Sequence, residues 1–159
     1  MTRYKYRSTP VLPWSPGGSD GYIADVSCFV GHEIVVTEKM DGENTTMYRD
    51  HIHARSVDSK HHPSRNWVKR LHGTFAHLIP EGWRLCGEHM YALHSIACEQ
   101  LDSYFYLFSV WDEHNRCLDW DEMLEWAMLL DLQVPRTFYR GVWNEQLLRD
   151  LQVDTNVCE

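Results

Sequence analysis

The chain has 159 residues, of which 43% are hydrophobic, and its net charge is −8 at pH 7. This length fits a single domain over residues 1–159, which would bury roughly 70% of the surface exposed by the unfolded chain. No apolar run is long enough to cross a membrane and no basic-then-apolar segment marks a signal peptide, so we expect a cytoplasmic protein without membrane contact. Five widely spaced cysteines without a C-x-x-C pair favour reduced thiols over a disulfide framework or a zinc ribbon.

The first predicted elements surround a lysine. Prolines and a glycine pair make residues 1–20 an irregular arm that lies over the core. The β-prone run 34–37 predicts a strand that ends close to Lys39, and Asp41-Gly42 then turns the chain back towards a second strand over residues 44–49. An amine at such a strand end, near a low-dielectric interior, can lose its proton and act as a nucleophile. A charged lysine beside an ordinary hairpin turn is the alternative, and the motif alone favours it.

The rest of the chain predicts a mixture of sheet and helix. The further predicted elements are a strand over 52–55, a helix from Pro63 to Leu78, strands over 83–90 and 104–111, and helices that begin at Asp119 and near Asn144. Residues 104–111 are almost wholly aromatic and aliphatic, which is typical of a buried strand. Strands at hairpin spacing with helices between them predict an α+β fold with largely antiparallel sheets and flanking helices.

Positive charge is concentrated in residues 55–70, where Asp58 is the single acid. A solvated helix face is the usual meaning of such a charge run, but a basic block just downstream of a nucleophile motif is equally consistent with contacts to phosphates. The ten histidines contain no H-E-x-x-H pattern, so they do not favour a structural zinc site.

Several motifs occur in a family-like order. They are Glu38-Lys39-Met40-Asp41-Gly42-Glu43-Asn44, Arg55-Ser56, Cys86-Gly87-Glu88 and Phe105-Tyr106-Leu107-Phe108. In this order and at these separations they resemble the covalent nucleotidyltransferase superfamily, and within it the ATP-dependent RNA ligases of the phage T4 RNA ligase 2 type. K-x-D-G alone is a weak signal, because ordinary residue frequencies produce it by chance. The resemblance covers residues 33–112 and implies the fold of a ligase adenylylation (nucleotidyltransferase) domain.

The resemblance implies a role for each motif residue towards ATP. Lys39 would attack the α-phosphate, expel pyrophosphate and become joined to AMP. Glu38 would accept a hydrogen bond from the adenine amino group, and Asn44 would hold a hydrated Mg²⁺ or Mn²⁺ ion through water. Arg55 would contact the ribose or the phosphates, and Glu88 would accept hydrogen bonds from the ribose hydroxyls.

The same resemblance implies RNA as the partner. Phe108 would stack on the adenine base, after which the AMP would pass to an RNA 5′-phosphate and a 3′-hydroxyl would displace it to seal the broken strand. We expect RNA contacts in the basic block from Lys60 to Arg70. The alternative function is a non-catalytic ATP- or RNA-binding module, a degenerate or half domain that keeps the nucleotide pocket.

The sequence departs from the family pattern near residue 159. The family has a later glutamate motif whose acid helps to bind metal, and then a lysine strand that contacts the ATP phosphates. Glu159 is a candidate for the first residue of the glutamate motif, and thus for a metal ligand, but no lysine strand follows it. We therefore expect a truncated chain, a half domain completed by strands of a second chain, or a degenerate module, with weak activity of this chain alone.

Overall fold

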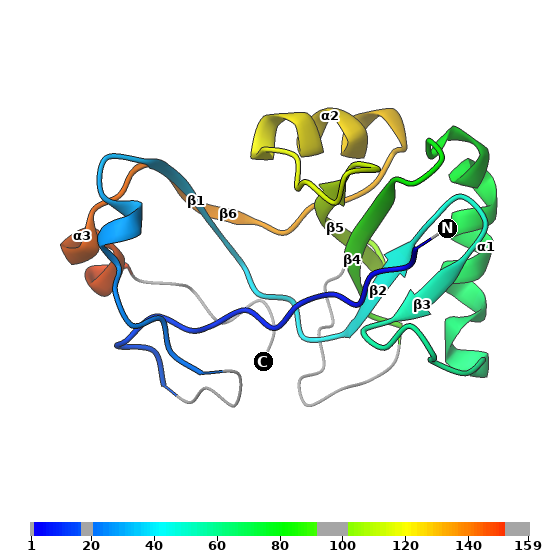
Figure 1. The fold of residues 1–159 in the computed structure, drawn as a ribbon, viewed down its shortest axis with the longest axis horizontal. Coiled ribbons are helices and arrows are strands. Elements are labelled where there is room, and N and C mark those ends of the chain that lie inside the picture. The colour runs from blue at the N-terminus through cyan, green and yellow to red at the C-terminus, as the bar shows by residue number, and fades with distance from the viewer. Residues whose placement is uncertain (1, 17–20, 92–101, 152–159) are drawn as a thin grey trace. The chain divides into compact units, whose positions relative to one another are not determined.

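The computed structural model describes residues 2–16, 21–91 and 102–151, which form two compact units (Figure 1). The large unit holds the described residues of 2–6 and 39–135, and the small unit holds those of 7–38 and 136–151. No helix in these described ranges is long and apolar enough to cross a lipid bilayer. Each unit is described separately below.

The large unit is built on a four-stranded antiparallel sheet with the strand order β3-β2-β4-β5. Its strands are β2 (Glu43–Met47), β3 (Ile52–Ala54), β4 (Arg84–His89) and β5 (Phe105–Trp111). β2 and β3 form the predicted hairpin, in which the Tyr48 N–H donates to the His51 carbonyl at 2.8 Å. The predicted strands over 83–90 and 104–111 are confirmed to within one residue at each end.

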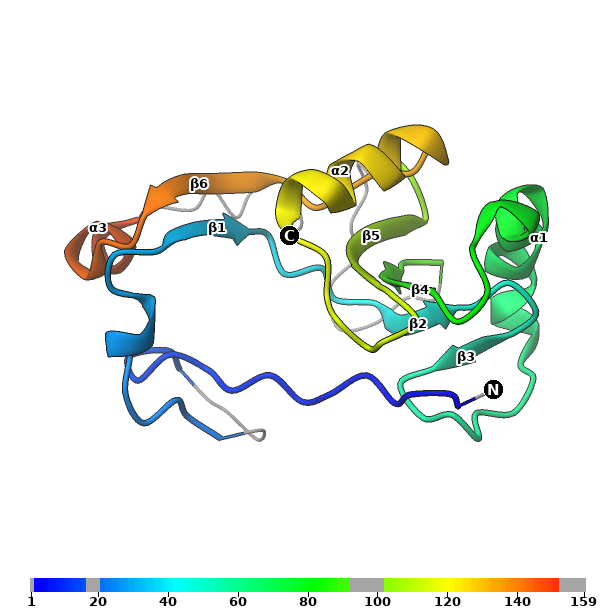
Figure 2. The ribbon, with the colours of Figure 1, turned by 45° about the horizontal axis from the view of Figure 1, so that its top comes forward.

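One face of this sheet forms the hydrophobic core, because successive side chains of a strand point to opposite faces. Met47 lies opposite Leu85 across the β2–β4 pair, and both side chains are fully buried together with Leu107. Residues of α1 (Asn66–Phe75) and α2 (Trp120–Leu129) complete the same core cluster. Figure 2 shows both helices beside the sheet.

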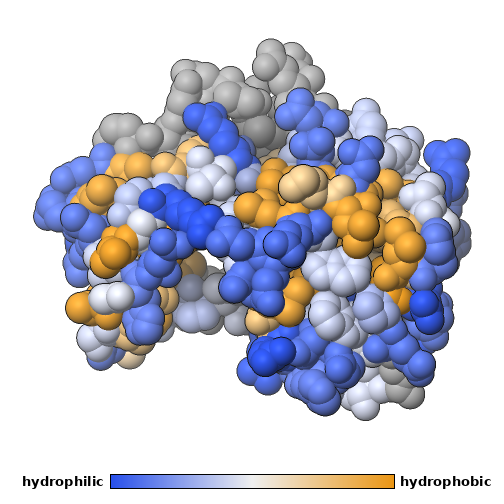
Figure 3. Space-filling model, turned by 90° about the horizontal axis from the view of Figure 1, so that it is seen from above, coloured by the Kyte–Doolittle hydropathy of each residue, from blue (hydrophilic) through white to orange (hydrophobic). Residues whose placement is uncertain are grey.

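The helices of the large unit begin and end close to the predicted residues. The 3₁₀ turns η2 (Pro63–Arg65) and η3 (Ala76–Leu78) flank α1, so the predicted helix from Pro63 to Leu78 is present with tighter ends. Asp119 and Glu122 form the predicted capping box at the start of α2. The other end of α2 exposes Met128 and Leu129, and Figure 3, viewed from the α2 side, shows apolar residues gathered on that face.

The small unit contains a two-stranded antiparallel ribbon of β1 (Glu33–Thr37) and β6 (Thr137–Val142). The 3₁₀ turn η1 (Ser27–Phe29) precedes the ribbon, and α3 (Glu145–Asp150) follows it. The ring of Phe29 stacks on that of Trp143 at a centroid distance of 4.7 Å. Asn144 caps α3, since its Oδ1 accepts from the Leu147 N–H at 3.0 Å, which confirms the predicted helix start.

The α+β class with antiparallel sheets is confirmed, but one local prediction is wrong. Asp41-Gly42 does not close a hairpin, because β1 pairs with β6 whereas β2 pairs with β3 and β4. The segment between β1 and β2 therefore connects two different sheets. The sequence pattern also does not predict β6, whose residue Arg140 forms an ion pair with Glu33, 107 residues earlier. That the chain is one domain with an irregular arm over residues 1–20 stays a prediction.

Candidate functional site

The face of the large sheet opposite the core is polar. Alternation places Asn44 and Thr46 of β2 on this face, where they lie opposite Glu88 and Cys86 of β4. The Thr46 Oγ1 lies 3.6 Å from the Cys86 Sγ. Burial raises the pKa of the Cys86 thiol to about 11, so this cysteine is a neutral group and no nucleophile.

Asn44 and Glu88 form the centre of the candidate site. They are directly opposite each other in the β2–β4 register. The Asn44 Oδ1 is buried, and no described residue donates a hydrogen bond to it. Buried amide oxygens are normally paired, so this atom is positioned to accept from a ligand or from the water shell of a cation.

Gly42 connects the segment that follows Lys39 to Glu88. Its N–H donates to the Glu88 Oε1 at 3.1 Å. A Cβ at this position would lie 2.5 Å from the His89 carbonyl oxygen and 2.7 Å from the Met90 Sδ, so only glycine permits this close approach. The glycine of the K-x-D-G motif thus holds the chain three residues after Lys39 against the end of β4.

Phe108 lies on the neighbouring strand at an irregularity. The β4–β5 register shifts between Cys86 and Gly87, whose partners are Ser109 and Leu107, so Phe108 is the extra residue on β5. Its side chain is partly buried, and the ring of Tyr6 meets it edge-on at a centroid distance of 5.3 Å. A bulge of this kind re-aims one side chain, here the predicted adenine-stacking residue.

Tyr6 is a residue of the site that the sequence patterns do not indicate. Burial raises the pKa of its hydroxyl, and the hydroxyl lies close to Ser109 on the polar face. Tyr4 reaches the same face, where its N–H donates to the Tyr48 hydroxyl oxygen at 2.9 Å and the Arg84 guanidinium lies over its ring at 4.9 Å. The one available signal is the alternation of two tyrosines within an arm otherwise rich in breakers.

Lys39 and Glu38 lie at the division between the two units. Lys39 begins the large unit, two residues beyond the end of β1, and its side chain is exposed rather than buried near an apolar interior. Glu38 belongs to the small unit, where its N–H donates to the Arg136 carbonyl at 2.8 Å. The large unit by itself therefore contains Lys39, Gly42, Asn44, Glu88 and Phe108, and within it Gly42, Asn44 and Glu88 are neighbours.

Arg55 and Arg65, two arginines of the basic region, differ in their exposure and in their partners. Arg55 is exposed and follows Ala54, the partner of Thr45, so its backbone is level with Asn44 on the neighbouring strand. Arg65 binds Glu43 through two contacts, Nε to Oε1 at 2.6 Å and Nη2 to Oε2 at 2.7 Å, and this pairing raises the Arg65 pKa. Arg65 thus braces the start of β2, and the contact of the block from Lys60 to Arg70 with RNA stays a prediction.

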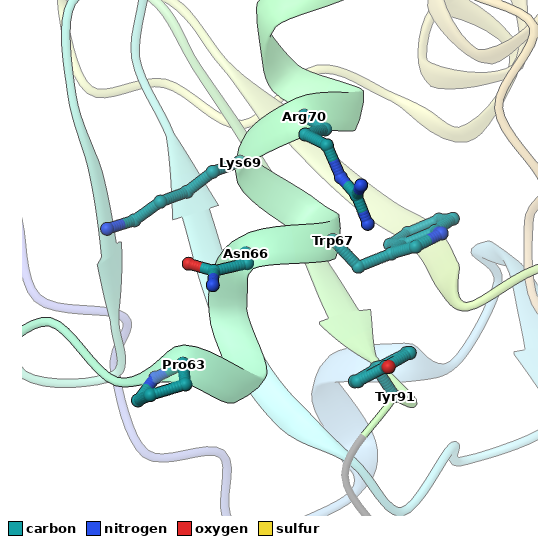
Figure 4. A pocket seen from close by; sticks show the side chains of 6 residues that line it. All are labelled: Pro63, Asn66, Trp67, Lys69, Arg70 and Tyr91. Carbon is teal, nitrogen blue, oxygen red and sulfur yellow. The ribbon is translucent and has the colours of Figure 1, made fainter.

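The cavities of the large unit lie elsewhere. The larger, about 620 Å³, is lined by residues of α1 and by Tyr91 (Figure 4). A second, about 360 Å³, contains four histidines, His51, His53, His61 and His72. Burial is the main cause that lowers the pKa of His51, His53 and His72. Within the described ranges no group of three or more His, Cys, Asp or Glu side chains is arranged to hold a metal ion. Glu159 lies outside the described residues.

The chain is similar to RNA ligases both in sequence and in fold. The model of the RNA ligase family matches residues 32–159. Among solved structures, the chain is similar to an RNA ligase of Naegleria gruberi, determined as a mutant in its apo form, with a TM-score of 0.51 and 20% sequence identity. The match covers 77% of this chain and 42% of the Naegleria chain. No curated protein matches the chain.

Proposed function

Because the chain belongs to the RNA ligase family, we propose that it carries the adenylylating site of an ATP-dependent RNA ligase. The fold shared with the Naegleria enzyme supports a nucleotidyltransferase domain of largely antiparallel sheets. This chain spans less than half the length of that enzyme, so the joining of RNA ends is proposed for the whole protein.

The proposed reaction begins at Lys39. Its amine, in the neutral form, donates an electron pair to the α-phosphorus of ATP, the bond from that phosphorus to the bridging oxygen breaks, and pyrophosphate leaves. The product is AMP joined to Nζ by a phosphoramidate bond, with the amine proton released to solvent. The exposed side chain of Lys39 leaves its amine accessible to a bound nucleotide.

The polar face would bind the rest of the nucleotide. Phe108 would stack on the adenine, Glu88 would accept from the ribose hydroxyls, and Arg55 would contact the ribose or phosphates. Tyr6 supports the first of these roles, because its edge contact holds the Phe108 ring from one side. Glu38 is proposed to accept a hydrogen bond from the adenine amino group, which would favour adenine over guanine.

Asn44 fits the role of orienting a hydrated Mg²⁺ or Mn²⁺ ion. Its buried Oδ1 lacks a donor among the described residues and therefore has a lone pair for a metal-bound water. Such an ion would stabilise negative charge on the phosphates. The observation that carries the proposal is this arrangement: Gly42, three residues from Lys39, donates a hydrogen bond to Glu88, beside an Asn44 oxygen that receives none from the described residues.

The proposal is tested by intact mass after incubation with ATP and Mg²⁺ or Mn²⁺. We expect one added AMP on the wild-type chain, none on Lys39→Ala, and an unchanged adduct on the control Lys60→Ala, which removes another exposed lysine of the large unit. An adduct that maps to a different residue would contradict the assignment. Competition among ATP, GTP and NAD identifies the nucleotide.

The RNA step would follow from the adduct. The enzyme-bound AMP would move to a 5′-phosphate at a nick or break, and a 3′-hydroxyl would then displace AMP and join the ends. Strands from a second chain or a longer form of this chain would supply further contacts to the triphosphate. If a longer form of this chain forms the AMP adduct no faster than this chain does, that part of the proposal is contradicted.

The second candidate is a non-catalytic module that binds ATP or RNA. The observation that favours it is the exposure of Lys39, because desolvation by the protein is one of the ways in which lysines become nucleophilic. This candidate predicts nucleotide binding without an adduct, and binding that survives Lys39→Ala. Equilibrium dialysis with ATP, alongside the mass measurement, separates the two functions.

A further inference from the structure

The larger cavity of the large unit lies on the helix-covered side of the sheet. Its lining is Pro63, Asn66, Trp67, Lys69, Arg70 and Tyr91 (Figure 4). Trp67 stacks on His89, which is next to Glu88 in β4 and so points to the opposite face. The cavity is therefore separate from the proposed nucleotide site around Asn44 and Glu88.

Two aromatic rings of the lining pack against neighbouring rings. His89 lies parallel to Trp67 (6.1 Å between centroids, 9° between planes) and to Tyr91 (6.1 Å, 4°). Tyr104 meets both Trp67 and Tyr91 edge-on, at 5.4 Å and 5.5 Å. Tyr91 nevertheless keeps 51% of its surface exposed. Rings fixed in this way lose little conformational entropy when a further flat group stacks on them.

The charged groups of the lining are positive, and none of the described residues that line the cavity is an acid. Arg70 follows Trp67 by three positions on α1, so both side chains share one helix face. Figure 4 shows the Arg70 guanidinium on the same side of the helix as the Trp67 and Tyr91 rings, with the Lys69 amine on the other side. The Lys69 Nζ lies 2.6 Å from the His61 Nδ1, at the border with the second cavity.

We propose that this cavity binds one nucleotide of a single-stranded RNA end, with the base against the rings of Trp67 and Tyr91 and the neighbouring phosphate on Arg70. Aromatic rings beside a cation match a base and its phosphate, and stacking on them requires a base face that a duplex does not offer. The identity of the polymer rests on the proposed function, whereas the stacking and charge contacts rest on the cavity alone. The site would hold substrate RNA apart from the point where AMP is transferred.

The test is the fluorescence anisotropy of a labelled single-stranded RNA of about 12 nucleotides, measured without ATP. Tyr91→Leu removes a stacking ring and is expected to weaken binding about tenfold. Its matched control is Tyr22→Leu, because Tyr22 is 52% exposed and Tyr91 51%. Equal affinity of the two variants would overturn the proposal.

Charge is tested by Arg70→Gln against Arg7→Gln, which removes another exposed arginine. Arg70→Gln is expected to weaken binding and to reduce the slope of log affinity against log salt by about 0.7, the value for one phosphate contact to a single strand. Arg7→Gln is expected to leave affinity within about twofold, as a solvated surface charge outside the site should. A slope that both variants change equally would overturn the placement of the phosphate on Arg70.

A strand with abasic residues separates stacking from charge. We expect Tyr91→Leu to have no effect on this probe, whereas Arg70→Gln still weakens it. An equal loss with Tyr91→Leu on the abasic strand would overturn base stacking. Circular dichroism confirms that each variant is folded, and Trp67 is left intact because it packs against the core.

The outcomes also distinguish this inference from the proposed function. Lys39→Ala abolishes the AMP adduct if the proposed function is right and leaves RNA binding in this cavity intact. Absence of any adduct together with a Tyr91-dependent affinity for RNA would remove the ligase proposal and retain the RNA site. An adduct on Lys39 with no effect of Tyr91→Leu or Arg70→Gln on RNA binding would do the reverse.

Discussion

The two faces of the four-stranded sheet differ in chemistry, although consecutive residues of the same strands supply them. On β4, Leu85 and His89 point towards the helices, whereas Cys86 and Glu88 point to the polar face. The first face is closed by apolar packing and ends in an aromatic row at the larger cavity. The second contains a buried amide oxygen without a donor among the described residues. Apolar packing and the proposed ligand chemistry thus lie on opposite faces of the same sheet.

The largest effect is expected on the helix-covered face. Leu85→Ala removes a fully buried side chain from the core and should lower the free energy of unfolding by about 2 to 5 kcal/mol. The measurement is urea unfolding followed by circular dichroism. Leu147→Ala is the control, because this leucine of α3 is 37% exposed and should cost far less. Similar losses in both variants would refute the division into a core face and a polar face.

The next effect concerns the brace at the start of β2. Arg65→Ala leaves the partly buried Glu43 carboxylate without its two short contacts and should cost about 1 to 3 kcal/mol. Arg140→Ala breaks the more exposed pair with Glu33 and should cost about 0.5 kcal/mol or less. Chemical unfolding of both variants makes the comparison. An equal cost would mean that the Arg65 pair is no stronger than a surface ion pair.

The third effect is a pH dependence from three buried or half-buried histidines. Burial lowers the folded-state pKa of His51, His53 and His72 below the unfolded value near 6.5. Their contribution to stability is therefore complete above about pH 6.5 and is lost as the pH falls through the lowered pKa values, by at most about 1.4 kcal/mol per pH unit for each proton. Urea midpoints between pH 7.5 and 5 measure this loss.

Two histidine variants show which side chain causes this pH dependence of stability. His53→Asn keeps a donor for the Ala54 carbonyl, which the His53 Nδ1 contacts at 2.5 Å, but removes the titrating ring. It should flatten the pH dependence, whereas His61→Gln on the exposed surface should not. Identical slopes in the two variants would show that the acid sensitivity arises elsewhere.

The smallest effect on stability is expected at the polar face, together with the sharpest effect on activity. Asn44→Ala removes a buried oxygen that no described residue pairs, so unfolding should change by less than about 1 kcal/mol. Formation of the AMP adduct should nevertheless fall by about 10- to 100-fold. Thr46→Val, on the same face of β2, is the control for adduct formation. A large loss of stability in Asn44→Ala with a normal rate of adduct formation would mean that Asn44 serves the stability of the fold and not the reaction.

The local patterns predicted most elements of the large unit. The hairpin of β2 and β3, the strand around Glu88 and the capped start of α2 each depend on a few neighbouring residues. The sequence does not predict β6, because this strand carries Arg140 and Gly141 and lacks apolar alternation. Its formation depends on a partner strand about 100 residues earlier. The supposed hairpin at Asp41-Gly42 failed for the same reason, since local turn chemistry does not say which strand becomes the neighbour.

The candidate site was predicted by residue type and order, and its assembly was not. Asn44 and Glu88 were singled out by a family resemblance, but their direct opposition depends on the register of β2 and β4. Tyr6 was missed because an irregular arm has no periodicity that would place its ring against Phe108. The sequence places Arg65 in a basic block but does not indicate that its guanidinium pairs with Glu43 of β2.

Local sequence patterns are enough to predict the α+β class, the K-x-D-G motif at Lys39 and the order of the motifs that follow. These properties are local, because they depend on the alternation of side chains, on caps and on the chemistry of single residues. Three features appear only in the folded chain: the hydrogen bond from Gly42 to Glu88, the buried Asn44 oxygen without a donor among the described residues, and the cavity flanked by Trp67 and Tyr91. Strand register and helix packing join residues far apart in the chain, and their free energy belongs to the whole core rather than to any one segment.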